Sequence, residues 1–232
     1  MLLAGSQAHT IGTDLSSSEK AVELARKHAF ISATLGYHPH DAKGMDPAHL
    51  KDLVQLATDP KVVAWGEIGL DFFRRRSPLD RQIEAFEKQI DCAKDVGLPI
   101  VIHCRDAHDK VIEILKKKGA THRGVIHCFS GDYGLALVYI DMGFLISIPG
   151  TVTYKNASTV QEVASLIPLD CLLVETDAPY LTPIPFRGKR NEPLYTVHTA
   201  RKIAELRSIT FEELALQTSR NAVSLFNLPV RL

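Results

Sequence analysis

A regular alternation of short apolar runs with longer amphipathic stretches is the feature that most constrains the fold of this chain. The runs are rich in Val and Ile, and several are apolar throughout, as strands buried on both faces are. They cover residues 1–4, 31–35, 62–65, 99–102, 124–126, 144–148 and 172–174. Between them, apolar residues recur at spacings of three and four, which predicts helices. Helices are expected from residue 18 onwards and over residues 47–57, 78–97, 106–119, 135–142, 158–166, 196–207 and 211–219.

The repetition of strand and helix predicts an α/β fold with a parallel sheet, in one domain spanning residues 1–232. No linker or low-complexity segment interrupts the pattern. A doubly wound open sheet and a TIM-like (β/α) barrel both have this order of elements. A closed barrel has eight strands, whereas seven runs are present, so a barrel would be incomplete at the N-terminus, with seven of eight strands.

The composition argues against several classes of protein. Lys plus Arg number 27 and Asp plus Glu number 27, so no global positive charge is available for binding nucleic acid. No apolar run approaches the roughly 20 residues of a membrane span, and no basic segment typical of a secretory signal precedes the first run. The four scattered cysteines predict reduced thiols and a cytoplasmic location. We expect a monomer that does not contact a membrane.

Ionisable side chains follow five of the apolar runs. They are His38, His40, Glu67, His103, His127 and Asp177. The carboxyl ends of parallel strands meet at one edge, where the active sites of barrels and open α/β sheets lie. Imidazole and carboxylate together suit Zn²⁺, Mn²⁺ and similar divalent ions. A bound ion of this kind activates water and stabilises a phosphoryl oxygen, so the set predicts metal-assisted hydrolysis.

Each of these residues taken alone also has an ordinary structural explanation. A single histidine after an apolar run is more often a satisfied structural residue than a ligand. Cys104 and Cys128 directly follow His103 and His127, so strand alternation points the thiols away from the imidazoles. We interpret both cysteines as buried apolar residues, and His9, which has no histidine partner in a His-x-His pair, as a loop residue.

Six sequence blocks carry a resemblance to a known family. They read Gly-Tyr-His-Pro-His-Asp (36–41), Gly-Glu-Ile-Gly-Leu-Asp (66–71), His-Cys-Arg-Asp-Ala (103–107), His-Cys-Phe-Ser-Gly (127–131), Glu-Thr-Asp-Ala-Pro-Tyr (175–180) and Arg-Gly-Lys-Arg-Asn-Glu-Pro (187–193). In this order, from about Gly12 to Leu228, they resemble the TatD family of metal-dependent deoxyribonucleases. The resemblance implies a TIM-like barrel that hydrolyses phosphodiester bonds in DNA, as an exonuclease on single strands or ends. It also implies one or two divalent ions per chain, Mg²⁺, Mn²⁺ or Zn²⁺.

The resemblance also assigns roles to individual residues. Glu67 matches a carboxylate that can bridge two metals, and His103 and His127 match imidazole ligands. Asp177 matches a carboxylate that binds metal and orients or deprotonates the attacking water. His38, and less strongly His40, match histidines at the mouth of the site that contact substrate phosphate or act in acid–base chemistry.

One departure from the family pattern bears on these roles. Family members usually begin with a strand that carries His-x-His, and this sequence has none. We therefore expect an N-terminally shortened reading of a longer gene, or a natural truncation. A two-metal site would lose the imidazoles of its first metal, whereas Glu67, His103 and His127 could still hold one ion. Two other functions stay open: hydrolysis of another small ester or phosphoester, and metal binding by a catalytically impaired barrel.

Two basic loops extend the expected site. The loop after the last apolar run ends in Arg190 and Asn191, and barrels often bind phosphate at this position. We predict that these two residues contact the DNA backbone. The arginines at residues 74–76 follow Phe72 and Phe73. They fit either a solvated charged loop or a funnel for single strands in which the phenylalanines stack on bases.

Overall fold

Seven strands alternate with helices in the computed structural model, which describes residues 8–119 and 123–229. The strands are β1 (Ala8–Ile11), β2 (Ile31–Leu35), β3 (Val62–Asp71), β4 (Ile100–Arg105), β5 (Gly124–His127), β6 (Phe144–Ile148) and β7 (Leu172–Val174). The α-helices are α1 (Leu15–Lys27), α2 (Pro47–Leu56), α3 (Leu79–Val96), α4 (His108–Lys118), α5 (Tyr133–Asp141), α6 (Ser158–Leu166), α7 (Thr196–Arg207) and α8 (Phe211–Phe226). Short 3-10 helices are η2 (Ala42–Gly44), η3 (Gly150–Thr153), η4 (Leu169–Cys171) and η5 (Pro193–Tyr195).

Most predicted elements match observed ones, but the start of the chain differs, and β3 and α8 run on beyond their predicted ends at residues 65 and 219. Strands β2, β6 and β7 and helices α6 and α7 have the predicted bounds. The predicted run at residues 1–4 lies outside the described residues. The interpretation of His9 as a loop residue is wrong, because His9 lies in β1 and pairs in register with Ser32 of β2. The sequence Ala-His-Thr-Ile contains no apolar run, so its local pattern does not predict a strand. Only the pairing with β2 identifies it as one.

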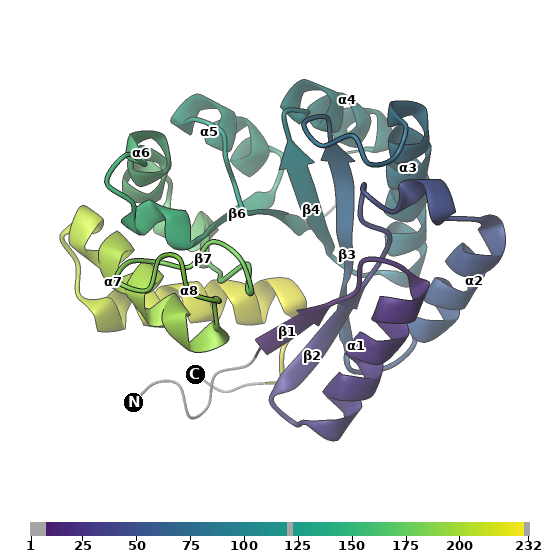
Figure 1. The fold of residues 1–232 in the computed structure, drawn as a ribbon, viewed down its shortest axis with the longest axis horizontal. Helices are drawn as coiled ribbons and strands as arrows, with labels where there is room; N and C mark the ends of the chain where they lie inside the picture. Colours follow the sequence, from purple (N-terminus) through teal and green to yellow (C-terminus); the bar gives the residue numbers. More distant parts are fainter. Residues whose placement is uncertain (1–7, 120–122, 230–232) are drawn as a thin grey trace. The chain divides into compact units, whose positions relative to one another are not determined.

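Contacts divide the chain into two compact units, residues 1–125 and 126–232. In the first unit, β1 pairs with β2, β2 with β3 and β3 with β4, all in parallel. Helices α1, α3 and α4 pack against these strands (Figure 1). Trp65 and Phe86 are fully buried between β3 and α3 and form part of the core. This unit carries His38, Glu67 and His103.

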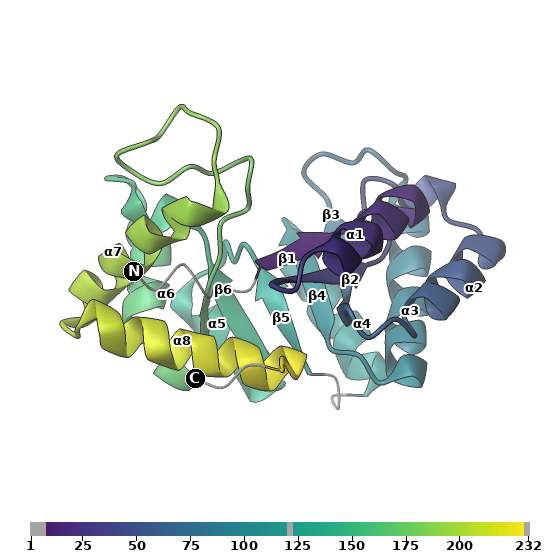
Figure 2. The same ribbon diagram turned by 90° about the horizontal axis from the view of Figure 1, so that it is seen from below.

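The second unit is built around the parallel pair of β6 and β7. Helix α5 packs on β6, α8 packs on β7, and α7 lies against α8 (Figure 2). The ring of Tyr139 meets that of Phe144 edge to face at 6.5 Å, and both residues are buried. No helix in the described part of the chain is long and apolar enough to cross a membrane. The four cysteines are free thiols.

Strand β3 continues six residues beyond the predicted end at Trp65, because Ile68 to Asp71 pair with β4. The register shifts between Trp65 and Ile68. A bulge of this kind turns a side chain away from regular alternation and is common next to active sites. Glu67 lies in this irregular segment, and not at the end of a strand as predicted.

Gly69 explains the second glycine of the block at residues 66–71. Its φ is +138°, a conformation that residues with a Cβ rarely adopt. A Cβ at this position would lie 2.0 Å from the carbonyl oxygen of His103. The close approach of β3 to β4 beside the two polar residues Glu67 and His103 therefore requires glycine.

Replacing Gly69 with alanine is expected to lower the free energy of unfolding by about 3 kcal/mol, since backbone strain and a displaced strand add together. Urea unfolding followed by circular dichroism measures the loss. Gly44→Ala is the matched control, because a Cβ there would meet nothing within 4 Å. A Gly69→Ala protein within about 0.5 kcal/mol of wild type would contradict the steric argument.

Candidate metal centre

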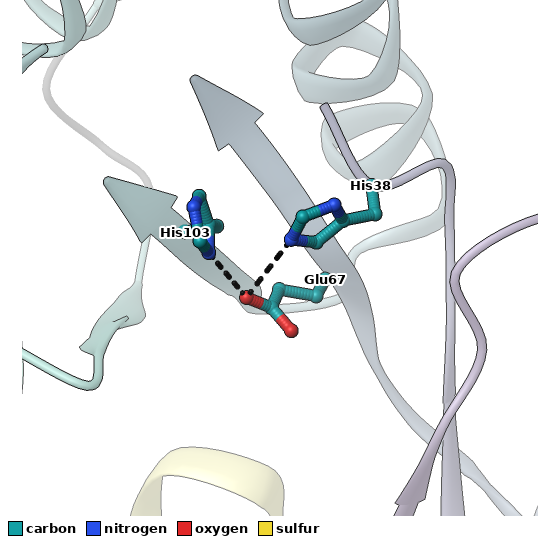
Figure 3. A group of neighbouring side chains, drawn as sticks. All are labelled: His38, Glu67 and His103. Carbon is teal, nitrogen blue, oxygen red and sulfur yellow. Dashed lines mark hydrogen bonds and ion pairs between the residues drawn. The ribbon is translucent and has the colours of Figure 1, made fainter. Parts of the chain in front are cut away.

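Two imidazoles and one carboxylate converge in the first unit. His103 Nδ1 lies 2.8 Å from Glu67 Oε1, and His38 Nε2 lies 3.6 Å from the same oxygen. Figure 3 shows both rings directed at this one carboxylate. One ligand atom from each residue lies within 4.8 Å of the other two. The structure thus brings together two of the four predicted metal ligands, and places beside them His38, which was predicted to contact substrate phosphate or act in acid–base chemistry.

Two buried glutamines of α3 fix the backbone that carries this cluster. Gln89 Oε1 accepts from the N–H of Tyr37 at 2.6 Å and from Trp65 Nε1 at 3.2 Å, and Gln89 Nε2 donates to the carbonyl of Tyr37 at 3.0 Å. Seven residues earlier, Gln82 Oε1 accepts from the N–H of Asp71 at 2.9 Å, and Gln82 Nε2 donates to the carbonyl of Asp71 at 3.2 Å. The side-chain amides of Gln89 and Gln82 thus serve as hydrogen-bond partners for the backbone of Tyr37 and Asp71, next to the cluster.

Asp71 joins the cluster from the end of β3. Its Oδ2 lies 2.8 Å from His40 Nε2 and 3.2 Å from His103 Nε2, and its Oδ1 accepts from the N–H of Arg74 at 2.6 Å. Burial opposes ionisation, but these hydrogen bonds outweigh it and hold the pKa of Asp71 well below its usual range. A carboxylate that accepts from the far nitrogen of a ligand imidazole fixes its orientation and tautomer. No role of Asp71 was predicted from the sequence.

The pKa values of the two histidines of the cluster are shifted in opposite directions. Burial lowers the pKa of His38 to about 4, and the nearby Glu67 only partly offsets this effect. His38 is therefore neutral at pH 7, as a metal ligand must be. Burial also opposes charge on His103, but hydrogen bonds to Asp71 and Glu67 prevail and raise its pKa to about 9. Without metal, His103 holds a proton between two carboxylates.

The donor set fits a divalent ion. Ligand atoms about 2.0–2.2 Å from a tetrahedral zinc lie about 3.3 Å apart. The 3.6 Å separation between His38 Nε2 and Glu67 Oε1 is close to this value, whereas the 2.8 Å contact between His103 Nδ1 and Glu67 Oε1 is a hydrogen bond. A bound ion would replace the proton that His103 shares with Glu67. Imidazole with carboxylate suits Zn²⁺ or Mn²⁺ better than Ca²⁺, which prefers oxygen ligands alone.

The stability of metal-free protein is expected to peak near pH 6.5. His103 has a folded pKa of about 9, above its unfolded value of 6.5, so its contribution is complete below pH 6.5 and is lost as the pH rises through 9. The loss is up to about 3 kcal/mol. His38 and His9, with pKa values lowered to about 4 by burial, resist protonation and lower stability as the pH falls from 6.5 to 4.

Urea unfolding in EDTA at pH 5, 6.5 and 9 measures both limbs of this profile. His103→Asn should flatten the alkaline limb and leave the acidic limb in place. An alkaline limb that is equally steep in wild type and variant would show that another group causes it.

A second pair of acidic residues meets His127 in the second unit. His127 Nδ1 lies 2.6 Å from Glu175 Oε2, and His127 Nε2 lies 3.4 Å from Asp177 Oδ1. Ser147 Oγ donates to the same Glu175 oxygen at 2.5 Å. Glu175 thus holds His127 as Asp71 holds His103, leaving Nε2 and the partly exposed Asp177 side by side. Glu175 stands in the block at residues 175–180, but its role was missed because only the contact with His127 reveals it.

The remaining predicted residues have different surroundings. His40 contacts Asp71. Asn191 is buried and donates both amide protons within its loop, to the carbonyls of Thr176 and Tyr180, at 2.6 Å each. It therefore stabilises the loop after β7, while Arg190 in the same loop is exposed. Contact of Arg190 and Asn191 with DNA stays a prediction.

The alternation of strands and helices is that of a TIM-like barrel. The two groups of imidazoles and carboxylates are typical of a metal-dependent hydrolase. The family described as TatD related DNase matches residues 4–227, so the chain belongs to that family. This confirms the resemblance drawn from the six sequence blocks.

Relatives and a solved structure agree with this assignment. The chain is 47% identical over 219 residues to the uncharacterized metal-dependent hydrolase YabD of Bacillus subtilis, covering 94% of this chain and 86% of YabD. It is 39% identical to the 3'-5' ssDNA/RNA exonuclease TatD of Erwinia amylovora, covering 94% of this chain and 86% of that protein. The crystal structure of YJJV, a TatD homologue from Escherichia coli, aligns with a TM-score of 0.90 and 33% identity, covering 96% of this chain and 87% of YJJV.

Proposed function

We propose that this chain hydrolyses phosphodiester bonds in single-stranded DNA, as an exonuclease that uses a divalent ion, Mg²⁺, Mn²⁺ or Zn²⁺. The convergence of His38 and His103 on Glu67 is the observation that carries the proposal, because it offers a neutral imidazole and a carboxylate at ligand distances. The relative named as a ssDNA/RNA exonuclease supports the choice of substrate. The free thiols support a cytoplasmic location.

In this proposal, each ionisable residue of the cluster has its own role. Glu67, His103 and His38 hold the ion, and Asp71 keeps the His103 ring oriented. When bound, the ion supplies an activated water and stabilises charge on the phosphoryl oxygen. His127 and Asp177 lie in the second unit, and their roles as a ligand and as the group that orients or deprotonates the water stay predictions. Asp177 is suited to the second role because its side chain is 30% exposed beside His127.

End-labelled single-stranded DNA incubated with Mg²⁺ or Mn²⁺ tests the proposal. We expect stepwise shortening from one end that EDTA and His103→Ala both abolish. His28→Ala is the matched control, because His28 is exposed at the opposite end of the sheet, before β2. A circular single strand should stay intact, since an exonuclease needs an end. Turnover of a nitrophenyl phosphodiester without any DNA cleavage would replace the proposal with a small-phosphoester hydrolase.

A further inference from the structure

An exposed aromatic ring with a guanidinium on its face stands beside the cluster of the first unit. The side chain of Phe73 is 58% exposed, although large aromatic residues usually bury their rings. The guanidinium carbon of Arg105 lies 4.2 Å from the centre of this ring. A single exposed apolar residue needs no explanation. Two further features distinguish this pair: its position next to the cluster, and the absence of an acidic partner of Arg105 among the described residues.

The pair lies at the carboxyl ends of β3 and β4. Phe73 comes two residues after Asp71, and Arg105 comes two residues after His103. Asp71 and Arg105 are partners in the parallel register, and the N–H of Phe72 donates to the carbonyl of Arg105 at 2.9 Å. The backbone that orients His103 and Asp71 thus also holds the ring and the guanidinium in place.

The charge of Arg105 is not neutralised by an acidic neighbour. Within the ranges that the structure describes, no Asp or Glu lies within 4.0 Å of its guanidinium. By contrast, Arg26 and Arg81 on the helices of the same unit both form ion pairs. A guanidinium without a carboxylate, next to the cluster of His38, Glu67 and His103, can bind phosphate through its planar fork.

We propose that Phe73 and Arg105 form a nucleotide subsite for single-stranded nucleic acid, in which the ring or the stacked guanidinium receives a base and Arg105 binds the adjoining phosphate. This proposal rests on the proposed function and names the residues that would hold one nucleotide of the substrate. Only an unpaired base can stack on a side chain in this way, so the subsite selects single strands over duplex. Stacking does not read the sugar, so the subsite accepts DNA and RNA alike.

Binding of a fluorescent phosphorothioate oligonucleotide, measured by anisotropy with Mg²⁺ present, tests the subsite. Phe73→Ala should weaken binding about 5-fold to 150-fold, and Phe73→Trp should restore it, because base–aromatic stacking contributes in this range. Phe30→Ala is the matched control, since Phe30 is 53% exposed at the amino end of β2. Arg105→Gln should reduce the slope of log affinity against log salt by about one ion.

A coupling measurement separates stacking from a general disturbance of the loop. Abasic sites are placed one at a time along the oligonucleotide. One position should weaken binding to wild type about 5-fold or more and leave binding to Phe73→Ala nearly unchanged. Losses that multiply independently at every position would overturn the subsite.

A cleavage assay with unmodified single-stranded DNA, run on the same protein preparations, distinguishes the two proposals. A wild-type protein that cleaves DNA while Phe73→Ala binds equally well would overturn the subsite alone. Base-dependent binding without any cleavage would support the subsite and overturn the nuclease. A wild type that binds no oligonucleotide would overturn the subsite whatever the protein hydrolyses.

Discussion

Replacing Glu67 with glutamine is expected to lower kcat/KM for single-stranded DNA by about 10³-fold or more, because an ion contributes several kcal/mol of transition-state stabilisation. Glu67 is the one carboxylate of the triad, and both imidazoles are directed at its Oε1. Glutamine keeps the shape of the side chain and removes its charge. The loss therefore reports metal binding and not repacking.

Isothermal titration with Mn²⁺ should show the same loss in affinity, independently of turnover. Glu84→Gln is the matched control, because Glu84 is a partly exposed residue of α3 that pairs only with Arg81 and Lys88 among the described residues. Near-normal metal affinity in Glu67→Gln would show that the ion binds elsewhere. Normal affinity with lost turnover would instead assign Glu67 to the chemical step.

Replacing Gln89 with alanine is expected to lower the free energy of unfolding by about 4 kcal/mol, although Gln89 touches no ionisable group of the site. The change leaves the N–H and carbonyl of Tyr37 and the Trp65 indole N–H without their partner in a buried region. Each unsatisfied buried group costs about 1–3 kcal/mol, and the deleted side chain leaves a cavity. For a chain of this size the melting temperature should fall by about 10 °C.

Differential scanning calorimetry measures this loss, with Lys88→Ala as the exposed neighbour that should change stability by less than about 0.5 kcal/mol. A second readout links the clamp to the site. Because Tyr37 directly precedes His38, a released backbone should also weaken Mn²⁺ binding under conditions where the variant is fully folded. Lost stability with unchanged metal affinity would confine Gln89 to a structural role.

Much of the architecture could be predicted because it depends on local pattern. The runs of β2, β6 and β7 are short and mostly apolar, so their burial follows from composition. Helix α3 was expected from its apolar spacing, and Gly97 ends it in the left-handed conformation that favours glycine. The polar residues after successive strands predicted that Glu67 and His103 would meet, and they do.

Other features depended on contacts between residues far apart in the sequence. β1 is a four-residue strand without an apolar run, so only its pairing with β2 identifies it and moves His9 from a loop into a sheet. β3 runs on to Asp71 because Gly69 lets it approach His103, which no window of sequence reveals.

Hydrophobic periodicity and motif spacing are local properties, so they were enough to predict the α/β class, the family and most of the ionisable residues of the site. Which of these residues lie together depends on the fold. His38 lies beside Glu67 and His103 because Gln89, 52 residues further along the chain, hydrogen-bonds the backbone of the preceding Tyr37. Asp71 and Glu175 gained their roles from the imidazoles they hold. Side-chain hydrogen bonds between segments far apart in the sequence set these positions, and hydrophobic periodicity does not predict such bonds.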